Sequence, residues 1–143
     1  MPLWVRVCYA YAGALNPRAA YDRSCELSIY IDKDSRKSGA GRALYTALEK
    51  LLLKQGIQNT YACIAYIDSE DEFLTHDSIK FHKAMGFSLI GHCHKCGYKF
   101  NRWYDMVWYE KHIGVHRNSP KPFIPIGSIS EKDLSDCGIS ARP

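Results

Sequence analysis

The chain has 143 residues, enough for one domain with a buried core. Its formal net charge is +4, and its 19 Lys and Arg are scattered rather than clustered, so we expect no nucleic-acid partner. No apolar stretch approaches the ~18 residues of a membrane span, and no charged segment with an apolar run opens the chain, so we expect a soluble, cytoplasmic protein without a membrane partner.

Six cysteines occur without an export signal, which favours reduced thiols. Residues 93–96 (CHKC), with His92 beside them, raise the alternative of a zinc site. A closed four-ligand zinc site would need a second paired cluster, and the sequence offers none. The segment also alternates like a strand, so the sequence predicts ordinary thiols and no metal.

Two strands are predicted in the first quarter of the chain. Residues 3–12 are rich in Val, Tyr and Trp, and Gly13 and the Asn16-Pro17 pair follow as turn signals. Residues 24–31 alternate in polarity, so Glu26 and Leu27 are expected on opposite faces of a sheet.

The most informative segment follows the second strand. Residues 36–42 read RKSGAGR and lead into an apolar-periodic helix that is predicted to end near Gln55, before Gly56. A basic, glycine-containing loop at a helix start presents backbone N–H groups, a positive helix end and cationic side chains to one point. The natural occupant of such a point is a phosphate or pyrophosphate.

Three kinds of phosphate loop compete for this segment. A P-loop would need Lys-Ser or Lys-Thr after Gly41, and a dinucleotide-binding turn would need a third glycine. Residues 36–41 instead satisfy the pattern [RQ]-x-x-G-x-[GA]. A basic turn without a ligand stays open as an alternative.

The second half of the chain predicts a strand, a helix and a pair of strands. Residues 59–67 form a nearly continuous apolar strand, and the acidic residues 68–72 a loop. Thr75 is the predicted N-cap of a helix that ends at Met85. Residues 87–98 and 103–110 are expected to pair around a turn at Asn101-Arg102. Residues 113–143, with four of the six prolines, predict an extended tail that docks on the body or stays mobile.

Residues 36–41 are similar to the coenzyme A pyrophosphate loop of the GNAT N-acetyltransferase superfamily. Together with other segments they resemble its phosphinothricin acetyltransferase branch in order and spacing, over residues 3–112. These segments are 8–13 (CYAYAG), 20–22 (AYD), 78–82 (SIKFH), 86–87 (GF), 97–99 (GYK) and 103–105 (WYD).

The resemblance implies an α/β (α+β) fold, a mixed and mostly antiparallel sheet of about five to six strands with two main helices. It implies an acetyltransferase domain over residues 1–112, followed by a tail over 113–143. It also implies that the strand, two helices and strand that open a complete domain are missing from this sequence.

The activity implied is acetyl-CoA-dependent N-acetyl transfer to the amine of a small amino-acid-like acceptor, of the phosphinothricin or methionine sulfoximine type. Acetyl-CoA is then the co-substrate, and no metal takes part. The alternative is an N-terminally truncated, non-catalytic module that binds coenzyme A. A homodimer, common in the resembled branch, is a further expectation.

The resemblance also assigns the cofactor-binding residues. The backbone of Ile29, Tyr30 and Ile31 would pair with the pantetheine arm as a neighbouring strand does. Thr75 stands where the family usually has an Asn that contacts coenzyme A. The pyrophosphate would be held by the loop residues Arg36, Lys37, Ser38, Gly39, Ala40, Gly41 and Arg42.

Three catalytic candidates follow from the same resemblance. Glu26 occupies the position of the proposed base, which must remove a proton from the amine; the alternative is a strand-face carboxylate paired with a cation. His82 would protonate the departing thiolate, or pack between helix and sheet. Tyr104 replaces a common His, although Tyr is a poor base at pH 7.

Arg18 and Tyr21 would help to form the acceptor site, where Arg suits a carboxylate or phosphinate.

Overall fold

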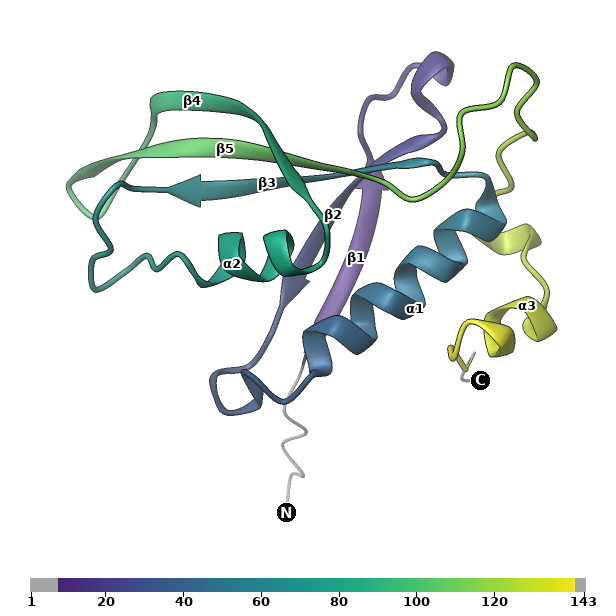
Figure 1. Cartoon of the computed structure of the whole chain (residues 1–143), viewed down its shortest axis with the longest axis horizontal. Coiled ribbons are helices and arrows are strands. Elements are labelled where there is room, and N and C mark those ends of the chain that lie inside the picture. Colours follow the sequence, from purple (N-terminus) through teal and green to yellow (C-terminus); the bar gives the residue numbers. More distant parts are fainter. Residues whose placement is uncertain (1–7, 141–143) are drawn as a thin grey trace.

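Figure 1 shows a computed structural model of the chain, in which residues 8–140 are described. A five-stranded sheet has the order β1-β2-β3-β5-β4. Its strands are β1 (Tyr9–Ala14), β2 (Ser24–Tyr30), β3 (Asn59–Tyr66), β4 (Ser88–Lys99) and β5 (Arg102–His112). The helices are α1 (Ala40–Gln55), α2 (Asp77–Ala84) and the short α3 (Glu131–Asp136). The predicted mixed sheet with two main helices is confirmed.

The sheet is mostly antiparallel, with one parallel pair. β1 pairs with β2, β3 with β5 and β5 with β4 in antiparallel fashion, while β2 and β3 run parallel. Parallel neighbours need a crossover connection, and α1 supplies it between β2 and β3. As expected from the sequence, α1 ends at Gln55 and is followed by Gly56.

The two main helices cover one face of the sheet and contact each other. The hydroxyl of Tyr45 in α1 lies 2.9 Å from Nε2 of His82 in α2. Alternate strand residues point toward these helices and form the core, among them Leu27, Ile64 and Val107. The residues between them point the other way. We call this second surface the open face; it carries Tyr11, Glu26, Tyr61, Cys63, Trp108 and Glu110.

The hairpin between β4 and β5 turns one residue earlier than expected. Phe100 and Asn101 form the turn, with φ of 54° and 59°. A two-residue hairpin favours positive φ at both positions, because this twist matches that of the strands. The Phe100 ring stacks on Phe73 at 4.1 Å between centroids, which holds an otherwise unfavourable aromatic residue in this turn.

The predicted cap of α2 is wrong by one residue, because His76 occupies the N-cap position. The preceding loop is held by its own acidic side chains. The Asp71 carboxylate accepts the N–H groups of Phe73 and Leu74, and Glu70 accepts that of His76. Thr75 accepts a long hydrogen bond of 3.4 Å from the amide of Asp77.

Residues 113–140 return to the C-terminal end of α1. The amide of Ile124 donates to the carbonyl of Gln55, whose side chain donates back to the carbonyl of Ile124. Asp133 pairs with Lys54 at 3.1 Å, and Cys137 is buried. The expectation of an extended segment did not include α3, and the division between domain and tail stays a prediction. No helix within residues 8–140 combines the length and apolarity needed to cross a membrane. The predicted strand segment 3–7 lies outside the described residues.

Candidate functional site

The strands β2 and β3 separate in the middle of the sheet. They pair at three successive positions only, from Ser24 opposite Asn59 to Glu26 opposite Tyr61. Beyond this point β2 continues along β1 to Tyr30, while β3 follows β5 to Tyr66 (Figure 1). Residues 27–30 therefore have no partner in β3, and an extended ligand could add to this edge as a strand does. We call this opening the fork.

The basic loop begins where the free part of β2 ends. After the 3-10 turn Lys33–Ser35, the chain passes through Lys37 and Gly39, both with positive φ, and enters α1 at Ala40. The first amides of a helix have no partner within it. The Ala40 amide makes a long hydrogen bond of 3.4 Å to the Ser38 hydroxyl. Free amides at the positive end of a helix favour an anion, so anion binding next to the fork stays a prediction.

The cations of the loop have different surroundings. Lys37 and Arg42 are exposed. Nη1 of Arg36 lies 3.8 Å from the Asp77 carboxylate, at the first residue of α2. Both partners are more than half exposed, so this ion pair orients the loop and adds little stability.

The two glycines of the loop are required for different reasons. Gly39 has φ 85° and open space around the position of a Cβ, so only its backbone conformation calls for glycine. A Cβ on Gly41 would lie 2.9 Å from Cε2 of Phe81 in α2 and 3.6 Å from Cδ1 of Ile29 in β2. Gly41 thus lets α1 approach α2 and the sheet closely. That both glycines also admit a phosphate stays a prediction.

Glu26 lies on the open face where the fork begins. Its neighbours across the sheet are Gly13 in β1 and Tyr61 in β3. Tyr61 is in turn opposite Glu110 of β5 and is hydrogen-bonded to its carboxylate. Burial, followed by this bond and the charge of Glu110, raises the pKa of Tyr61 to about 12. Two carboxylates therefore flank one protonated tyrosine.

Tyr61 and Glu110 were not among the site residues that the sequence indicated. Tyr61 belongs to an apolar strand, and Glu110 lies close to the end of the last strand, far from Glu26 along the chain. The available signal was the alternation of β3 and β5, which puts both side chains on the face opposite Ile64 and Val107. The register that brings them together depends on long-range pairing.

His82 of α2 is buried against α1 and the start of β4, with 3% of its surface exposed. Nδ1 lies 2.7 Å from the carbonyl of Ser78, which accepts only, so this nitrogen carries the proton. Nε2 then accepts from the hydroxyl of Tyr45. Burial lowers the pKa of His82 from its ordinary value. These contacts support the packing alternative, and a catalytic role of His82 stays a prediction.

Tyr104 is tied to the loop that follows β3. Its hydroxyl donates to the Asp71 carboxylate at 2.8 Å, and Arg102 donates to the same oxygen at 2.9 Å. Partial burial raises the pKa of Asp71, but these bonds and two from backbone amides outweigh it and bring that pKa to about 2. Tyr104 lies six residues before Glu110, or ~20 Å along a strand, so it is not brought beside Glu26.

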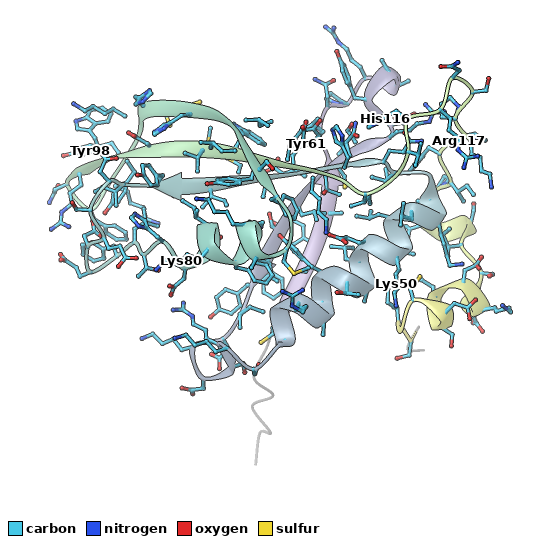
Figure 2. The ribbon with its side chains drawn as sticks, viewed as in Figure 1. Lys50, Tyr61, Lys80, Tyr98, His116 and Arg117 are labelled. Atoms are coloured by element: carbon cyan, nitrogen blue, oxygen red, sulfur yellow. The ribbon has the colours of Figure 1, made fainter. Side chains whose placement is uncertain are left out.

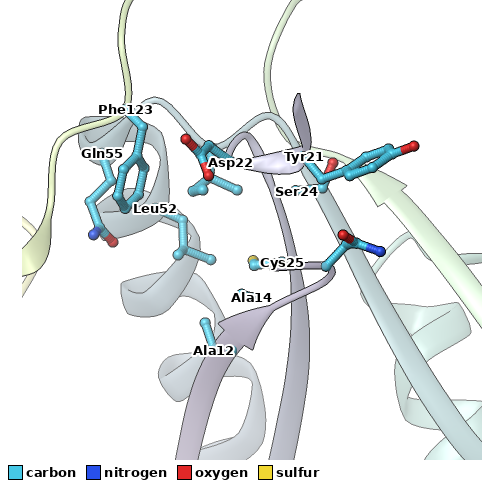
Figure 3. Close-up of a pocket in the computed structure, with 12 residues that line it drawn as sticks. Ala12, Ala14, Tyr21, Asp22, Ser24, Cys25, Leu52, Gln55 and Phe123 are labelled. Atoms are coloured by element: carbon cyan, nitrogen blue, oxygen red, sulfur yellow. The ribbon is translucent and has the colours of Figure 1, made fainter. Parts of the chain in front are cut away.

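The remaining candidates lie at the edges of the site. Arg18 and Thr75 are exposed, in the connections before β2 and before α2. Tyr21 lines a pocket of about 220 Å³ together with Cys25, Leu52 and Phe123 (Figure 3). Cys25 belongs to the core face of β2, so this pocket and Glu26 lie on opposite faces. The role of Arg18 and Tyr21 in acceptor binding stays a prediction.

The site thus combines a strand fork with a basic loop at a helix start, an arrangement that suits an extended, phosphate-bearing ligand. Residues 7–108 match the acetyltransferase (GNAT) domain family, and the chain belongs to this family. The chain is 36% identical over 106 residues to an N-acetyltransferase of Streptomyces griseus, covering 74% of this chain and 51% of the relative.

Two further relatives are similar to the chain. A phosphinothricin N-acetyltransferase of Streptomyces viridochromogenes is 31% identical over 121 residues, which cover 84% of this chain and 61% of that protein. The crystal structure of a phosphinothricin acetyltransferase from Sinorhizobium meliloti, in complex with AcCoA, matches with a TM-score of 0.69 and 31% identity. That match covers 80% of this chain and 59% of the other. The chain thus spans a half to three fifths of the length of these relatives.

Proposed function

We propose that this chain binds acetyl-CoA and transfers the acetyl group to the amine of a small amino-acid-like acceptor, of the phosphinothricin or methionine sulfoximine type. The observation that carries the proposal is the fork between β2 and β3, which opens directly onto the basic loop at the start of α1. The names of the relatives and the AcCoA complex of one of them support it.

The residues present suit this ligand. The free edge of β2 around Ile29 and Tyr30, continued by Ile31, would pair with the pantetheine arm. The loop from Arg36 to Arg42 would receive the pyrophosphate through its amides and through the charges of Lys37 and Arg42. Thr75 would offer a hydroxyl near the start of α2. Bound acetyl-CoA supplies an activated acetyl group.

Glu26 is the proposed base of the reaction. An acceptor amine is protonated at neutral pH and must lose a proton before it can attack the thioester. The Glu26 carboxylate would attract the ammonium group and accept this proton, directly or through a water molecule. Glu110, held by Tyr61, adds a second negative charge on the same face. The C–N bond forms as the C–S bond breaks, and the sulfur leaves as a thiolate that takes up a proton.

A homodimer and a cytoplasmic location are part of the proposal. The open face exposes Tyr9, Tyr11 and Tyr30, whose rings stack on one another, and a second copy of the chain would cover them. All six cysteines are free, as suits a reducing compartment. Light scattering of the purified chain tests the dimer.

The transfer reaction is tested with the purified chain, acetyl-CoA and a panel of amines that includes phosphinothricin and methionine sulfoximine. The readout is the thiol released, with and without each amine. The proposal predicts thiol release that depends on the acceptor. Binding of coenzyme A without release for any amine would contradict it and favour the second candidate, a non-catalytic module that binds coenzyme A.

A further inference from the structure

The hairpin of β4 and β5 carries a cluster of metal-ligating side chains. In the sheet, both strands lie beyond β3 from the fork. One ligand atom from each of His92, His94 and Asp105 lies within 4.8 Å of the other two. We propose that these three residues bind a divalent transition-metal ion of the Zn²⁺ class. The proposal does not depend on acetyl transfer.

Strand geometry explains why the three side chains meet. His92 and His94 are two residues apart on β4 and so project to the same face. β4 pairs with β5 so that His92 is opposite Val107 and Cys93 opposite Met106, the residue after Asp105. Asp105 therefore lies beside the part of β4 that continues from Cys93 to His94. The imidazole rings of His92 and His94 stack at 4.1 Å between centroids and are 9° from parallel. Two nitrogen donors therefore stand side by side next to one carboxylate.

An irregularity of β4 fixes the carboxylate in place. The register shifts between Cys93 and Gly97, and Lys95 within this bulge has φ 49°. The backbone thereby turns its amide toward Asp105, and Lys95 N–H donates to Oδ1 at 2.7 Å. Oδ2 lies 2.7 Å from Nε2 of His92. The Lys95 amide lies outside the ligand set, and support of this kind orients a ligating carboxylate. The direct contact between Oδ2 and Nε2 would be replaced by bonds to the ion.

The donor set selects the class of ion. Imidazole nitrogens suit zinc, copper, nickel and cobalt, and a carboxylate oxygen completes a set of three. Metal–ligand bonds of about 2.0–2.2 Å place the donors of a tetrahedral site about 3.4 Å apart. Small side-chain rotations bring the present donors to that spacing, because both histidines lie at the surface. Three protein ligands leave a fourth position for water.

This cluster is distinct from the thiols considered in the sequence analysis. Cys93 lies between the two histidines on β4, so its side chain projects to the opposite face. A site of two histidines and one aspartate therefore needs neither Cys93 nor Cys96. It needs no second pair of cysteines either, so the lack of such a pair in the sequence does not exclude it.

A bound ion would join the hairpin to the loop after β3. The ring of Tyr66 packs edge-on against His92 and stacks on His76, both at 5.4 Å between centroids. An ion held by His92 would thus brace β4, β5 and the end of β3 together. Any ligand that binds only the folded chain raises its thermal stability.

The test is calorimetric titration of Zn²⁺ into the full chain carrying Cys93→Ser and Cys96→Ser, which removes the nearby thiols. In this background we expect one saturable site, which His94→Gln and Asp105→Asn weaken by at least ~10-fold. His116→Gln, an exposed histidine outside the cluster, should leave the affinity within twofold. His94 makes no side-chain hydrogen bond to a described residue, so His94→Gln should keep the melting temperature measured without metal.

Co²⁺ gives an independent readout of the ligands. With nitrogen and oxygen donors, the bound ion should show d–d absorption without a thiolate charge-transfer band. Three results would overturn the proposal: no saturable Zn²⁺ binding, equal affinity in His94→Gln and its background, or binding that disappears with the two cysteines. The last result would assign the site to the thiols.

Discussion

Glu26 and Tyr61 are the last two residues that pair β2 with β3, and the fork opens immediately beyond them. This places a carboxylate at the closed end of the opening, while the basic loop lies beyond its other end, after Tyr30. A ligand that spans the fork would therefore have its phosphates at the loop and its far end near Glu26. The proposed roles of the carboxylate and of the loop can therefore be tested separately.

Glu26→Gln tests this separation. The amide keeps the shape of the side chain but cannot accept the amine proton, so turnover should fall by about 100-fold or more. Coenzyme A affinity should stay within twofold, because the loop is unchanged. Steady-state thiol release and calorimetry measure the two quantities. The control is Glu131→Gln on α3, which should change neither turnover nor coenzyme A affinity. Unchanged turnover in Glu26→Gln would show that Glu26 is not the base.

The buried pair of Tyr45 and His82 predicts a pH dependence of stability. Burial lowers the pKa of His82 in the folded state below its ordinary value of 6.5, so the unfolded chain binds this proton more readily. The free energy of unfolding should therefore fall as the pH drops below about 6.5. Urea unfolding between pH 7.5 and 5 measures it.

Two variants isolate the histidine. His82→Gln should have a shallower slope of stability against pH, whereas the exposed-site variant His116→Gln should keep the slope of the unmodified chain. Tyr45→Phe should cost about 1–2 kcal/mol at pH 7, because Nε2 of His82 loses its donor. If His82→Gln keeps the full slope, the buried neutral histidine is not its source.

Tyr104→Phe tests whether this residue supports the loop or the chemistry. The change removes the hydrogen bond to Asp71, which anchors the segment after β3 to β5. We expect a lower melting temperature and turnover within about twofold, since Tyr104 lies ~20 Å along β5 from the level of Glu26. Thermal unfolding and thiol release are measured on the same preparation. A large loss of turnover at an unchanged melting temperature would instead assign Tyr104 to catalysis.

Local patterns in the sequence predicted most of the fold. The alternation around Glu26 and Leu27 placed these residues on opposite faces, and Gly56 predicted that α1 ends near Gln55. The cap of α2 was misplaced because side chains of the acidic loop, led by Asp71, compete for the amides before the helix. α3 was not expected, because a six-residue helix carries little periodicity of its own.

The candidate site was predictable only in part. The loop from Arg36 to Arg42 is contiguous, so its residue types alone indicate an anion-binding site. The fork is set by the register of β2 against β3, and the Tyr61–Glu110 pair by that of β3 against β5. The contact of Gly41 with Phe81 likewise joins two helices. Such contacts arise from packing between segments that are distant in the chain, and a single sequence does not reveal them.

The most direct measurement is calorimetric binding of coenzyme A to the chain and to two charge variants. Lys37→Glu combined with Arg42→Glu reverses two exposed cations of the loop and should weaken binding by at least ~10-fold. Lys50→Glu is the control, because it reverses one exposed cation on the same helix, eight residues and therefore about 12 Å beyond Arg42. Figure 2 shows Lys50 on α1.

We expect one coenzyme A site per chain, loss of affinity in the double variant and unchanged affinity in Lys50→Glu. No binding by the unmodified chain, or equal binding by all three proteins, would contradict the assignment of this loop to coenzyme A.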